Sequence, residues 1–318
     1  MMGRILILAP KNDLHTKAVS AVLRRDFGVD PLVLDVEQLP KQLTGEFSYS
    51  KGELGSQLGG IDLSRVTVIW NRRPAPSDIP TGVNGNDRYF MQAECDHFTQ
   101  GMLWSLPVSW INHPWYDRVA SRKIVQLTHA RHCGLRLPTT MVTNDPEAAQ
   151  RFLHHYPTAI VKRTGASNLG YSKTELVDAK VIERLTTIRN SPSTFQEYIS
   201  GADLRVTWID GFCFAVRIRS DIGMSPEDCR FDHTVPYEPW DVPEALEAKI
   251  AQLMKSLSLR YGALDFRFRG TTNEEPFFLE VNPAGQFVYL EVKTGLPMTA
   301  TLAKCLVRLC CIADSPVN

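Results

Sequence analysis

A strand–helix–strand pattern at the start of the chain constrains the fold more than any other feature of the sequence. The apolar run at residues 5–9 has the character of a buried strand, residues 14–27 are amphipathic, and residues 31–36 form a second apolar run. Two buried strands joined through a helix form a parallel sheet with helices on its faces. No GxGxxG motif follows the first strand, so a dinucleotide site at this turn has no support.

From Thr158 onward the sequence changes to a mixed alternation of strands and helices. Asp210-Gly211 separates two strand-like segments and is a strong hairpin signal. The expected strands of this region are residues 159–163, 194–199, 204–209, 212–218 and 263–269. The long helices expected after residue 36 are residues 87–106 and 117–134, before Thr158, and residues 242–259 and 299–312, after it. The pattern predicts a fold of class α/β in the first part and α+β in the second.

Length and composition narrow the class of protein. With 318 residues the chain exceeds one typical core, which predicts two or three subdomains. Lys+Arg and Asp+Glu balance at 35 each, which argues against a surface for nucleic acid or for an anionic membrane. Seven cysteines without a CxxC motif favour reduced thiols and a cytoplasmic location. The first apolar run is too short for a signal-peptide core, and no run approaches the length of a membrane helix.

An acidic segment near the C-terminus predicts a metal site. Asp265 ends an apolar stretch, a polar turn follows at residues 270–275, and Glu280 and Asn282 then lie two residues apart in a strand-like run. A period of two places Glu280 and Asn282 on one face of a strand. Mg²⁺ takes oxygen ligands and keeps phosphate and water among them, so these three side chains suit one or two ions. The alternative is a charged hairpin with a solvated face.

A lysine and a small-residue loop predict phosphate contacts. Lys162 ends a strand and is followed at once by the loop Thr164–Gly170. Small residues let backbone N–H groups approach a phosphate closely, and the lysine supplies positive charge. The residues of this loop that we expect at the phosphates are Gly165, Ser167 and Gly170. The loop is not a Walker A motif, because no Lys-Ser/Thr pair follows its last glycine.

Two further groups of residues are candidates for contacts with a nucleotide. A strand edge at Gln196, Glu197 and Ile199 can bind an adenine, and Asp203 can accept hydrogen bonds from ribose hydroxyls. Three arginines then follow along two adjacent strands and could converge on a phosphoryl group; they are Arg205, Arg217 and Arg219. The alternative for each arginine is an exposed face of an antiparallel sheet.

Arg72 and Arg73 mark a second candidate site. They end the strand-like run at residues 65–70 and precede Pro74. The carboxyl ends of strands in α/β sheets are where ligands bind, so both arginines are candidate substrate contacts. A solvated turn is the alternative for this pair.

The order of these features resembles the ATP-grasp superfamily, and the resemblance covers essentially the whole chain. Within the superfamily the sequence is most similar to the graspetide macrocyclases of the microviridin type. The motifs that carry this narrower resemblance are residues 68–74 (VIWNRRP), 110–114 (WINHP), 121–127 (SRKIVQL), 134–140 (GLRLPTT) and 143–144 (TN). Their joint occurrence in order is specific, although each motif alone is not.

The resemblance implies a fold and a set of roles. It implies an N-terminal pre-ATP-grasp parallel α/β domain at 1–115, a central α+β lid domain at 116–192 and a C-terminal antiparallel-sheet catalytic domain at 193–318. Lys123 and Lys162 would contact the ATP phosphates, and Arg205 and Arg217 would stabilise the γ-phosphate and the acyl phosphate. The adenine edge would be lined by Gln196, Glu197 and Ile199, the ribose by Asp203, and Mg²⁺ would be held by Asp265, Glu280 and Asn282. Gln196 stands at a position that is often acidic in the superfamily.

The resemblance also implies an activity and partners. A graspetide enzyme activates a carboxylate as an acyl phosphate and lets a Thr or Ser hydroxyl or a Lys amine attack it, which gives an ω-ester or ω-amide ring. Its partner is a ribosomally made precursor peptide with a leader and a core rich in Thr/Ser/Lys and Asp/Glu. Relatives with this architecture suggest a homodimer. Residues 228–233 would then contact the peptide or merely cap a turn; the candidates are Asp228, Arg230, Asp232 and His233.

Two other functions remain open at the level of sequence. One is an ATP-grasp ligase of the RimK type, which joins a free amino acid to a carboxylate. The other is a nucleotide-binding regulatory module with a degenerate site, against which the presence of both lysines and all three metal-ligand candidates counts.

Overall fold

The structure is a computed structural model, and it describes residues 3–164, 174–224, 234–271 and 274–313. The chain divides into two compact units. The first comprises Met1–Pro114 together with Pro297–Asn318, and the second comprises Trp115–Leu296. Each unit is described by itself.

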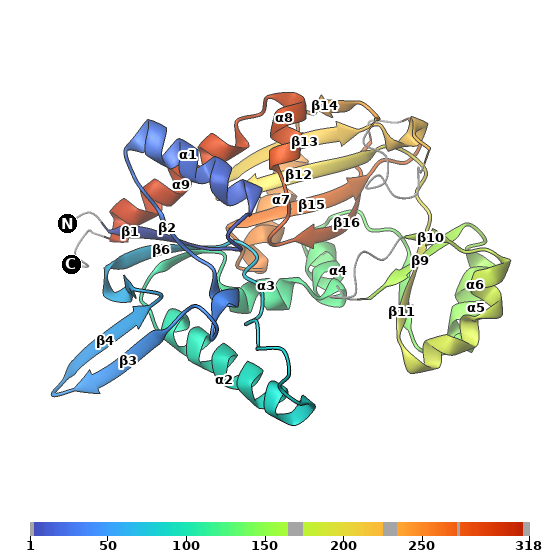
Figure 1. The fold of residues 1–318 in the computed structure, drawn as a ribbon. Helices are drawn as coiled ribbons and strands as arrows, with labels where there is room; N and C mark the ends of the chain where they lie inside the picture. The colour runs from blue at the N-terminus through green and yellow to red at the C-terminus, as the bar shows by residue number, and fades with distance from the viewer. Residues whose placement is uncertain (1–2, 165–173, 225–233, 272–273, 314–318) are drawn as a thin grey trace. The chain divides into compact units, whose positions relative to one another are not determined.

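The first unit is built on a four-stranded sheet of order β2-β1-β6-β7, in which every neighbouring pair is parallel. Its strands are β1 (Arg4–Leu8), β2 (Leu32–Leu34), β6 (Val66–Asn71) and β7 (Ser109–Ile111). Its helices are α1 (Leu14–Phe27), α2 (Gly85–Trp104) and α9 (Met298–Ala313). Residues of α2 share a buried cluster with β1 and β6, while α9 contacts both strands and α1 (Figure 1). The predicted strand–helix–strand start and its parallel sheet are therefore confirmed.

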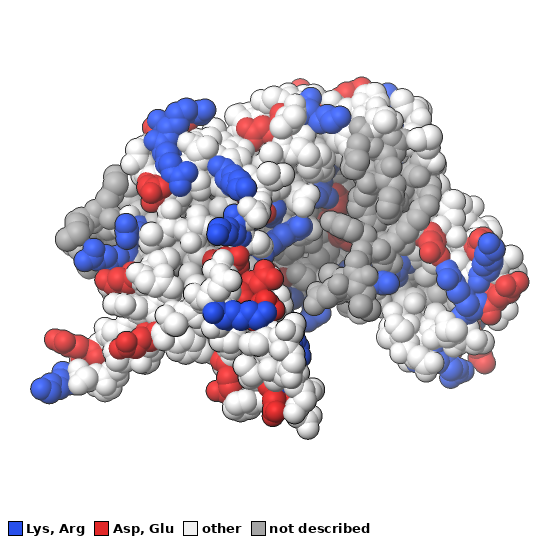
Figure 2. Space-filling model, viewed as in Figure 1, with Lys and Arg blue, Asp and Glu red and all other residues white. Residues whose placement is uncertain are grey.

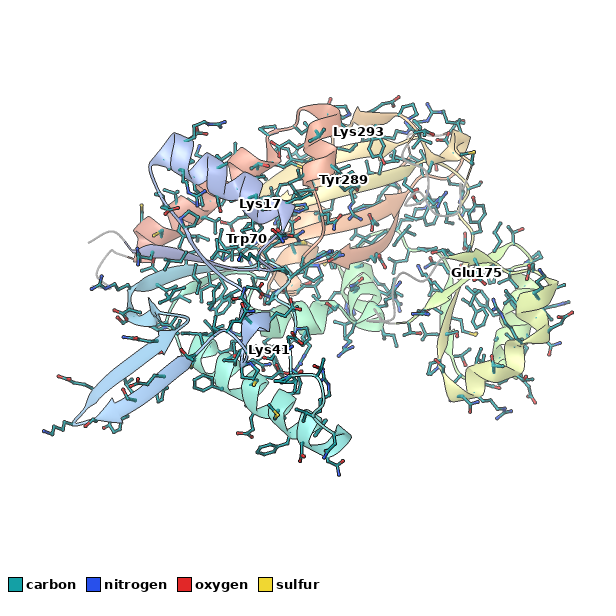
Figure 3. The ribbon with its side chains drawn as sticks, in the orientation of Figure 1. Lys17, Lys41, Trp70, Glu175, Tyr289 and Lys293 are labelled. Carbon is teal, nitrogen blue, oxygen red and sulfur yellow. The ribbon has the colours of Figure 1, made fainter. Side chains whose placement is uncertain are left out.

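Local chemistry explains the bounds of α1. The side chain of Asp13 accepts a hydrogen bond from the backbone N–H of Thr16 at 2.7 Å, which satisfies a free donor of the first turn. Gly28 ends the helix with φ 63°, a left-handed conformation that glycine adopts without steric cost. Trp70 on β6 lies inside this unit (Figure 3), and only 2% of its surface is exposed to solvent.

A small antiparallel ribbon of order β3-β4-β5 completes the first unit. Its strands are β3 (Gly45–Ser50), β4 (Glu53–Leu58) and β5 (Ile61–Asp62), with short 3-10 turns at Val36–Gln38 and Leu63–Arg65 on either side. Strands β3 and β4 pair along their whole length, from Gly45 opposite Leu58 to Ser50 opposite Glu53.

The C-terminal helix lies elsewhere than the sequence suggested. The predicted third domain, 193–318, includes α9, but α9 belongs to the first compact unit and packs on α1 and β6. The physical reason is the apolar side of α9: Leu302, Leu306 and Leu309 are buried at helical spacing, and this side needs a sheet face to cover it. The first predicted boundary, at 115, falls beside the observed division after Pro114.

The second unit contains two antiparallel sheets. The smaller has order β10-β9-β11-β8, with strands β8 (Thr140–Thr143), β9 (Ala159–Arg163), β10 (Glu175–Leu176) and β11 (Ser193–Glu197). Helices α5 (Pro146–His155) and α6 (Ala179–Glu183) and a 3-10 turn at Leu185–Asn190 accompany it. Buried Phe152, Ile188 and Phe195 form their common core.

The larger sheet has five strands in the order β14-β13-β12-β15-β16, and every neighbouring pair is antiparallel. The strands are β12 (Asp203–Ile209), β13 (Phe212–Ile218), β14 (Tyr237–Pro239), β15 (Tyr261–Arg267) and β16 (Phe277–Asn282). The elements around it are α3 (Pro114–Ala120), α4 (Lys123–His132), α7 (Glu244–Ser256), α8 (Val288–Thr294) and a 3-10 turn at Ser220–Ile222.

The two faces of the larger sheet differ in chemistry. Leu204, Val206 and Trp208 point to one face and share a buried cluster with α7, including Ile250. Successive side chains of a strand point to opposite faces. The alternate residues of β12, which begin with Asp203 and Arg205, therefore point to the other face, and this polar face carries the candidate site.

Two predicted features of this unit have different outcomes. The Asp210-Gly211 hairpin is confirmed, since Ile209 faces Phe212 across the turn and both turn residues have positive φ. The single helix expected over residues 117–134 is wrong, because the chain forms α3 and α4 with a break between Ala120 and Lys123. Arg122 adopts an extended conformation there, with φ −86° and ψ 112°.

Acidic and basic side chains are interspersed on the face drawn in Figure 2, among the residues shown in colour. None of the helices in the described part of the chain has the length and apolar character that crossing a bilayer requires.

Candidate active site

Three charged side chains form a row across the polar face of the larger sheet. Arg205 on β12 lies directly opposite Asp265 on β15, and Asp265 lies directly opposite Glu280 on β16. Directly opposed residues of antiparallel strands point to the same face, so their side chains meet. Arg205 forms an ion pair with Asp265, and the Lys123 Nζ lies 2.9 Å from Glu280 Oε2. Two carboxylates therefore lie between two cations.

The two carboxylates have opposite pKa shifts. Burial raises the pKa of Asp265; the neighbouring Arg205 opposes this, while the negative charge of Glu280 adds to it. Burial acts against ionisation of Glu280 too, but the positive charges of Lys123 and then Lys162 outweigh it and lower the pKa of Glu280 to about 2. Shifted acids placed side by side in this way are typical of functional sites.

The donor set fits a hard divalent cation. Asn282 lies two residues after Glu280 on β16, and its amide oxygen accepts a hydrogen bond from the Ala284 N–H at 3.1 Å. Asp265 and Glu280 keep 29% and 37% of their side-chain exposure, so an ion can reach them from solvent. No group of three Asp, Glu, His or Cys side chains that could hold a metal occurs among the described residues. Two carboxylates and an amide would leave coordination positions of the ion open for phosphate and water, which Mg²⁺ favours as ligands.

Lys162 on β9 is held by a neutral partner. Its Nζ donates to Gln196 Oε1 at 2.9 Å, and Gln196 Nε2 in turn donates to Thr140 Oγ1 at 2.7 Å. An acidic residue in place of Gln196 would neutralise the lysine. The carboxamide orients Lys162 without cancelling its charge, which leaves that charge to act on Glu280 and on an anionic ligand.

The remaining nucleotide candidates take part in local structure. Glu197 accepts a hydrogen bond from the Thr139 N–H at 3.1 Å and pairs with Arg269; burial works against its ionisation, yet these contacts lower its pKa. Asp203 accepts from Ser220 Oγ at 2.7 Å and lies 3.4 Å from Arg267. Ile199 is buried. The predicted adenine and ribose contacts of these residues stay predictions.

The three predicted arginines do not converge. The register pairs Arg217 with Leu204, so Arg217 points to the apolar face of the sheet while Arg205 points to the polar face. The guanidinium carbon of Arg217 lies 4.6 Å from the centre of the Phe268 ring. Arg219 makes a two-pronged ion pair with Asp221 at 3.0 and 3.1 Å. Of the three, the structure brings only Arg205 to Asp265.

Arg72 is an internal side chain of the first unit. It keeps 1% of its exposure, lies 3.4 Å from Asp13 through Nε and contacts His15 Nδ1 at 3.0 Å through Nη2. The alternative of a solvated turn is therefore wrong for Arg72. Arg73 is exposed and has φ 50°. Both arginines lie at the carboxyl end of β6, and their predicted substrate contacts stay predictions.

This cluster predicts a pH-dependent stability. Burial and then the charges of Arg72 and Arg73 lower the pKa of His15 to about 4, against the opposing effect of Asp13. An unfolded chain takes up a proton on His15 below its ordinary pKa of 6.5, while the folded chain does so only near 4. Stability is therefore lost as the pH falls from about 6.5 to 4, by up to about 3 kcal/mol.

Urea unfolding between pH 4 and pH 7 measures this effect. His15→Gln keeps a polar partner for Arg72. We expect the free energy of unfolding of this variant to fall much less, as the pH is lowered, than that of the unmodified protein. Parallel stability curves for the two proteins would contradict the assignment to His15.

Some predicted site residues lie outside the described part of the chain. They are Gly165, Ser167, Gly170, Asp228, Arg230, Asp232 and His233. Their roles stay predictions.

Two further residues near the row, Tyr289 and Gln126, were given no role in the row by sequence reasoning. Tyr289 and Lys293 both lie on α8 (Figure 3). The Lys293 Nζ is 5.4 Å from the centre of the Tyr237 ring. Burial favours the neutral form of Arg205, but Asp265 and then Tyr289 raise its pKa, which places Tyr289 within electrostatic reach of the row. Gln126 on α4 is buried and contacts β16. Gln126 belongs to the motif at residues 121–127, but nothing in that motif indicates a contact with β16.

Comparisons with known proteins bear on the fold of the chain. No protein-family model matches the sequence, and no curated protein matches it at a significant level. Among solved structures, the macrocyclase MdnC from Microcystis aeruginosa, bound to its precursor peptide MdnA, has 26% identity and a TM-score of 0.83, with 96% of this chain and 99% of that chain covered.

Two further structures extend the match. A RiPP-associated ATP-grasp ligase from Chryseobacterium gregarium, in complex with ADP and a leader and core peptide, has 23% identity and a TM-score of 0.84 over 99% of this chain and 98% of that chain. The ATP-grasp ligase PsnB, complexed with a minimal precursor variant, Mg and ADP, has 23% identity and a TM-score of 0.81, with 98% of this chain and 99% of that chain covered. The predicted fold is thereby confirmed: the chain has the ATP-grasp fold, in the form shared by ligases and macrocyclases of ribosomally made peptides.

Proposed function

We propose that this protein is an ATP-dependent ligase that closes macrocycles in a ribosomally made precursor peptide. The observation that carries the proposal is the row Arg205, Asp265 and Glu280, with Lys123 on Glu280, in a fold that matches a peptide macrocyclase over almost the whole chain. The structures of the Chryseobacterium ligase and of PsnB contain ADP, and that of PsnB also contains Mg, which supports ATP and Mg²⁺ as the cofactors here.

The reaction has two steps. A substrate carboxylate oxygen attacks the γ-phosphorus of ATP, the bond to the β-phosphate oxygen breaks, and ADP leaves with an acyl phosphate as the other product. A Thr or Ser hydroxyl or a Lys amine of the same peptide then attacks the acyl carbon. Phosphate leaves, the nucleophile loses its proton, and an ω-ester or ω-amide ring forms. No protein nucleophile is needed.

The residues of the row have distinct roles in this proposal. Asp265, Glu280 and Asn282 would hold Mg²⁺, which neutralises phosphate charge when bound. Lys123 and Lys162 would bind phosphate oxygens, since their charges already reach Glu280. Arg205, fixed by Asp265, would stabilise the charge that spreads over the transferring phosphoryl group.

The proposed partner is a precursor peptide with a leader and a core that mixes Thr/Ser/Lys with Asp/Glu. MdnC was solved with a precursor peptide, the Chryseobacterium ligase with a leader and core peptide, and PsnB with a variant of a minimal precursor, which supports a peptide partner. The homodimer and the cytoplasmic location stay predictions, and light scattering of the purified protein tests the first of them.

Co-expression with a candidate precursor tests the reaction class. The candidate is a short open reading frame beside the gene whose C-terminal half mixes Thr/Ser/Lys with Asp/Glu. The proposal predicts a peptide mass lower by one water for each ring. A gain of one residue mass would instead identify an amino-acid ligase of the RimK type. An unchanged peptide together with no ADP formation would point to a regulatory nucleotide-binding module.

A further inference from the structure

Gln126 makes three hydrogen bonds, of which two tie α4 to the strand of the proposed metal ligands, β16, and one ties it to α3. Its side-chain Nε2 donates to the Val281 carbonyl at 2.8 Å and to the Ala120 carbonyl at 2.6 Å, and its Oε1 accepts from the Val281 N–H at 3.0 Å. Gln126 keeps 3% of its exposure, so these bonds are shielded from water. Their partners are separated from Gln126 by up to 155 residues in the chain.

The position of Val281 makes this contact informative. Val281 lies between Glu280 and Asn282, two of the three proposed Mg²⁺ ligands, and β16 is the edge strand of its sheet. An edge strand has N–H and C=O groups that no neighbouring strand satisfies. The Gln126 carboxamide presents one donor and one acceptor to the same residue, as a neighbouring strand would. It therefore fixes the edge of β16 between the two ligands.

The same helix supplies Lys123, the cation that contacts Glu280. Lys123 and Gln126 are three residues apart on α4, which places them on one side of the helix. Lys123 then contacts Glu280 while Gln126 contacts the next residue, Val281. A shift of α4 along β16 would break both contacts together. The Ala120 carbonyl ends α3, so the bond to it also anchors the break between the two helices.

We propose that Gln126 is a positioning residue that sets the register of α4 against β16. In this role it holds Lys123 on Glu280 and keeps Glu280 and Asn282 in the orientation that a magnesium–nucleotide complex requires. The inference rests on the proposed function. Groups that orient metal ligands without touching the metal typically contribute 10- to 100-fold to metal affinity.

A merely structural role would have a different signature. A buried hydrogen bond that only stabilises the fold affects the unfolding equilibrium, not the dependence of ligand binding on the ion. Gln126→Met keeps the length and approximate volume of the side chain and removes both the donor and the acceptor. Ile250→Val is the matched control, because it also weakens the buried interior of the second unit but removes no hydrogen bond to β16.

Calorimetric titration with ADP, in the presence of Mg²⁺ and in its absence, separates these roles. We expect Gln126→Met to weaken Mg²⁺-dependent ADP binding by about 10- to 100-fold and to change Mg²⁺-independent binding much less. Ile250→Val should keep both affinities. Equal Mg²⁺ dependence in Gln126→Met and in the unmodified protein would overturn the inference, as would an equal loss in both variants.

Hydrogen exchange of the unmodified protein provides a test that needs no variant and no ligand. We expect the Val281 amide to exchange as slowly as amides in the interior strand β15, although it faces the edge of the sheet. Exchange at the rate of an open edge would overturn the inference even if Gln126→Met fails to fold. If the unmodified protein shows slow exchange at Val281 but no Mg²⁺-dependent ADP binding, the proposed function fails while the contact between α4 and β16 stands.

Discussion

Asp265→Asn should reduce precursor-dependent ADP formation by more than about 100-fold, because loss of a direct metal ligand should exceed the 10- to 100-fold that an indirect one costs. The substitution removes a negative charge beside Glu280 and leaves Arg205 without the carboxylate that orients it. The side-chain volume is almost unchanged, so packing is kept. A coupled assay of ADP release at saturating peptide measures the effect.

The matched control for this substitution is Asp145→Asn. Asp145 caps α5 through the Glu147 N–H at 3.0 Å, and asparagine caps helices equally well. We expect this control to keep its activity within about twofold because surface substitutions of this kind perturb little. Full activity of Asp265→Asn at ordinary Mg²⁺ concentrations would show that Asp265 is not a ligand.

Arg205→Met should reduce turnover by about 10³-fold, at the lower end of what an arginine on a transferring phosphoryl group supplies. Arg205 lies on the polar face of the larger sheet, is paired with Asp265 and keeps 17% of its side-chain exposure. The substitution should lower the rate of phosphoryl transfer and change the affinity for ADP much less, because the charge that Arg205 stabilises develops only during transfer. Single-turnover kinetics and ADP titration separate the two.

Arg217→Met offers a contrast within the same sheet. The two arginines are expected to be equivalent on sequence, but the register places Arg217 on the opposite face beside Phe268. We expect Arg217→Met to lower turnover by less than about tenfold, since cation–π contacts of this kind contribute about 1 kcal/mol. A loss as large as that of Arg205→Met would mean that the register does not decide the catalytic role.

The sequence predicted the elements whose pattern is local. The first two strands and α1 follow from short-range periodicity and from the cap at Asp13, and the Asp210-Gly211 turn dictates its own hairpin. The position of α9 depends on packing between the two ends of the chain, which no local pattern contains. The break between α3 and α4 was missed because the apolar residues on its two sides, Val119 and Ile124 among them, lie near the spacing of one continuous helix.

The candidate site was predictable only in part for the same reason. A period of two places Glu280 and Asn282 on one face of a strand, and this needs no knowledge of the fold. The pairing of Arg205 with Asp265 depends on the register of β12 against β15, which is set by the packed sheet. Gln126 and Val281 are too far apart in the chain for any motif to join them.

The stoichiometry of the purified reaction tests the central claim most directly. Protein, ATP, Mg²⁺ and the candidate precursor are mixed, and ADP released is compared with water lost from the same peptide by mass spectrometry. We predict one ADP for each water lost, and no loss of water when Mg²⁺ is removed with a chelator. Rings that form without ADP, or ADP release that continues unchanged without Mg²⁺, would contradict a mechanism in which these carboxylates hold the ion that carries phosphoryl transfer.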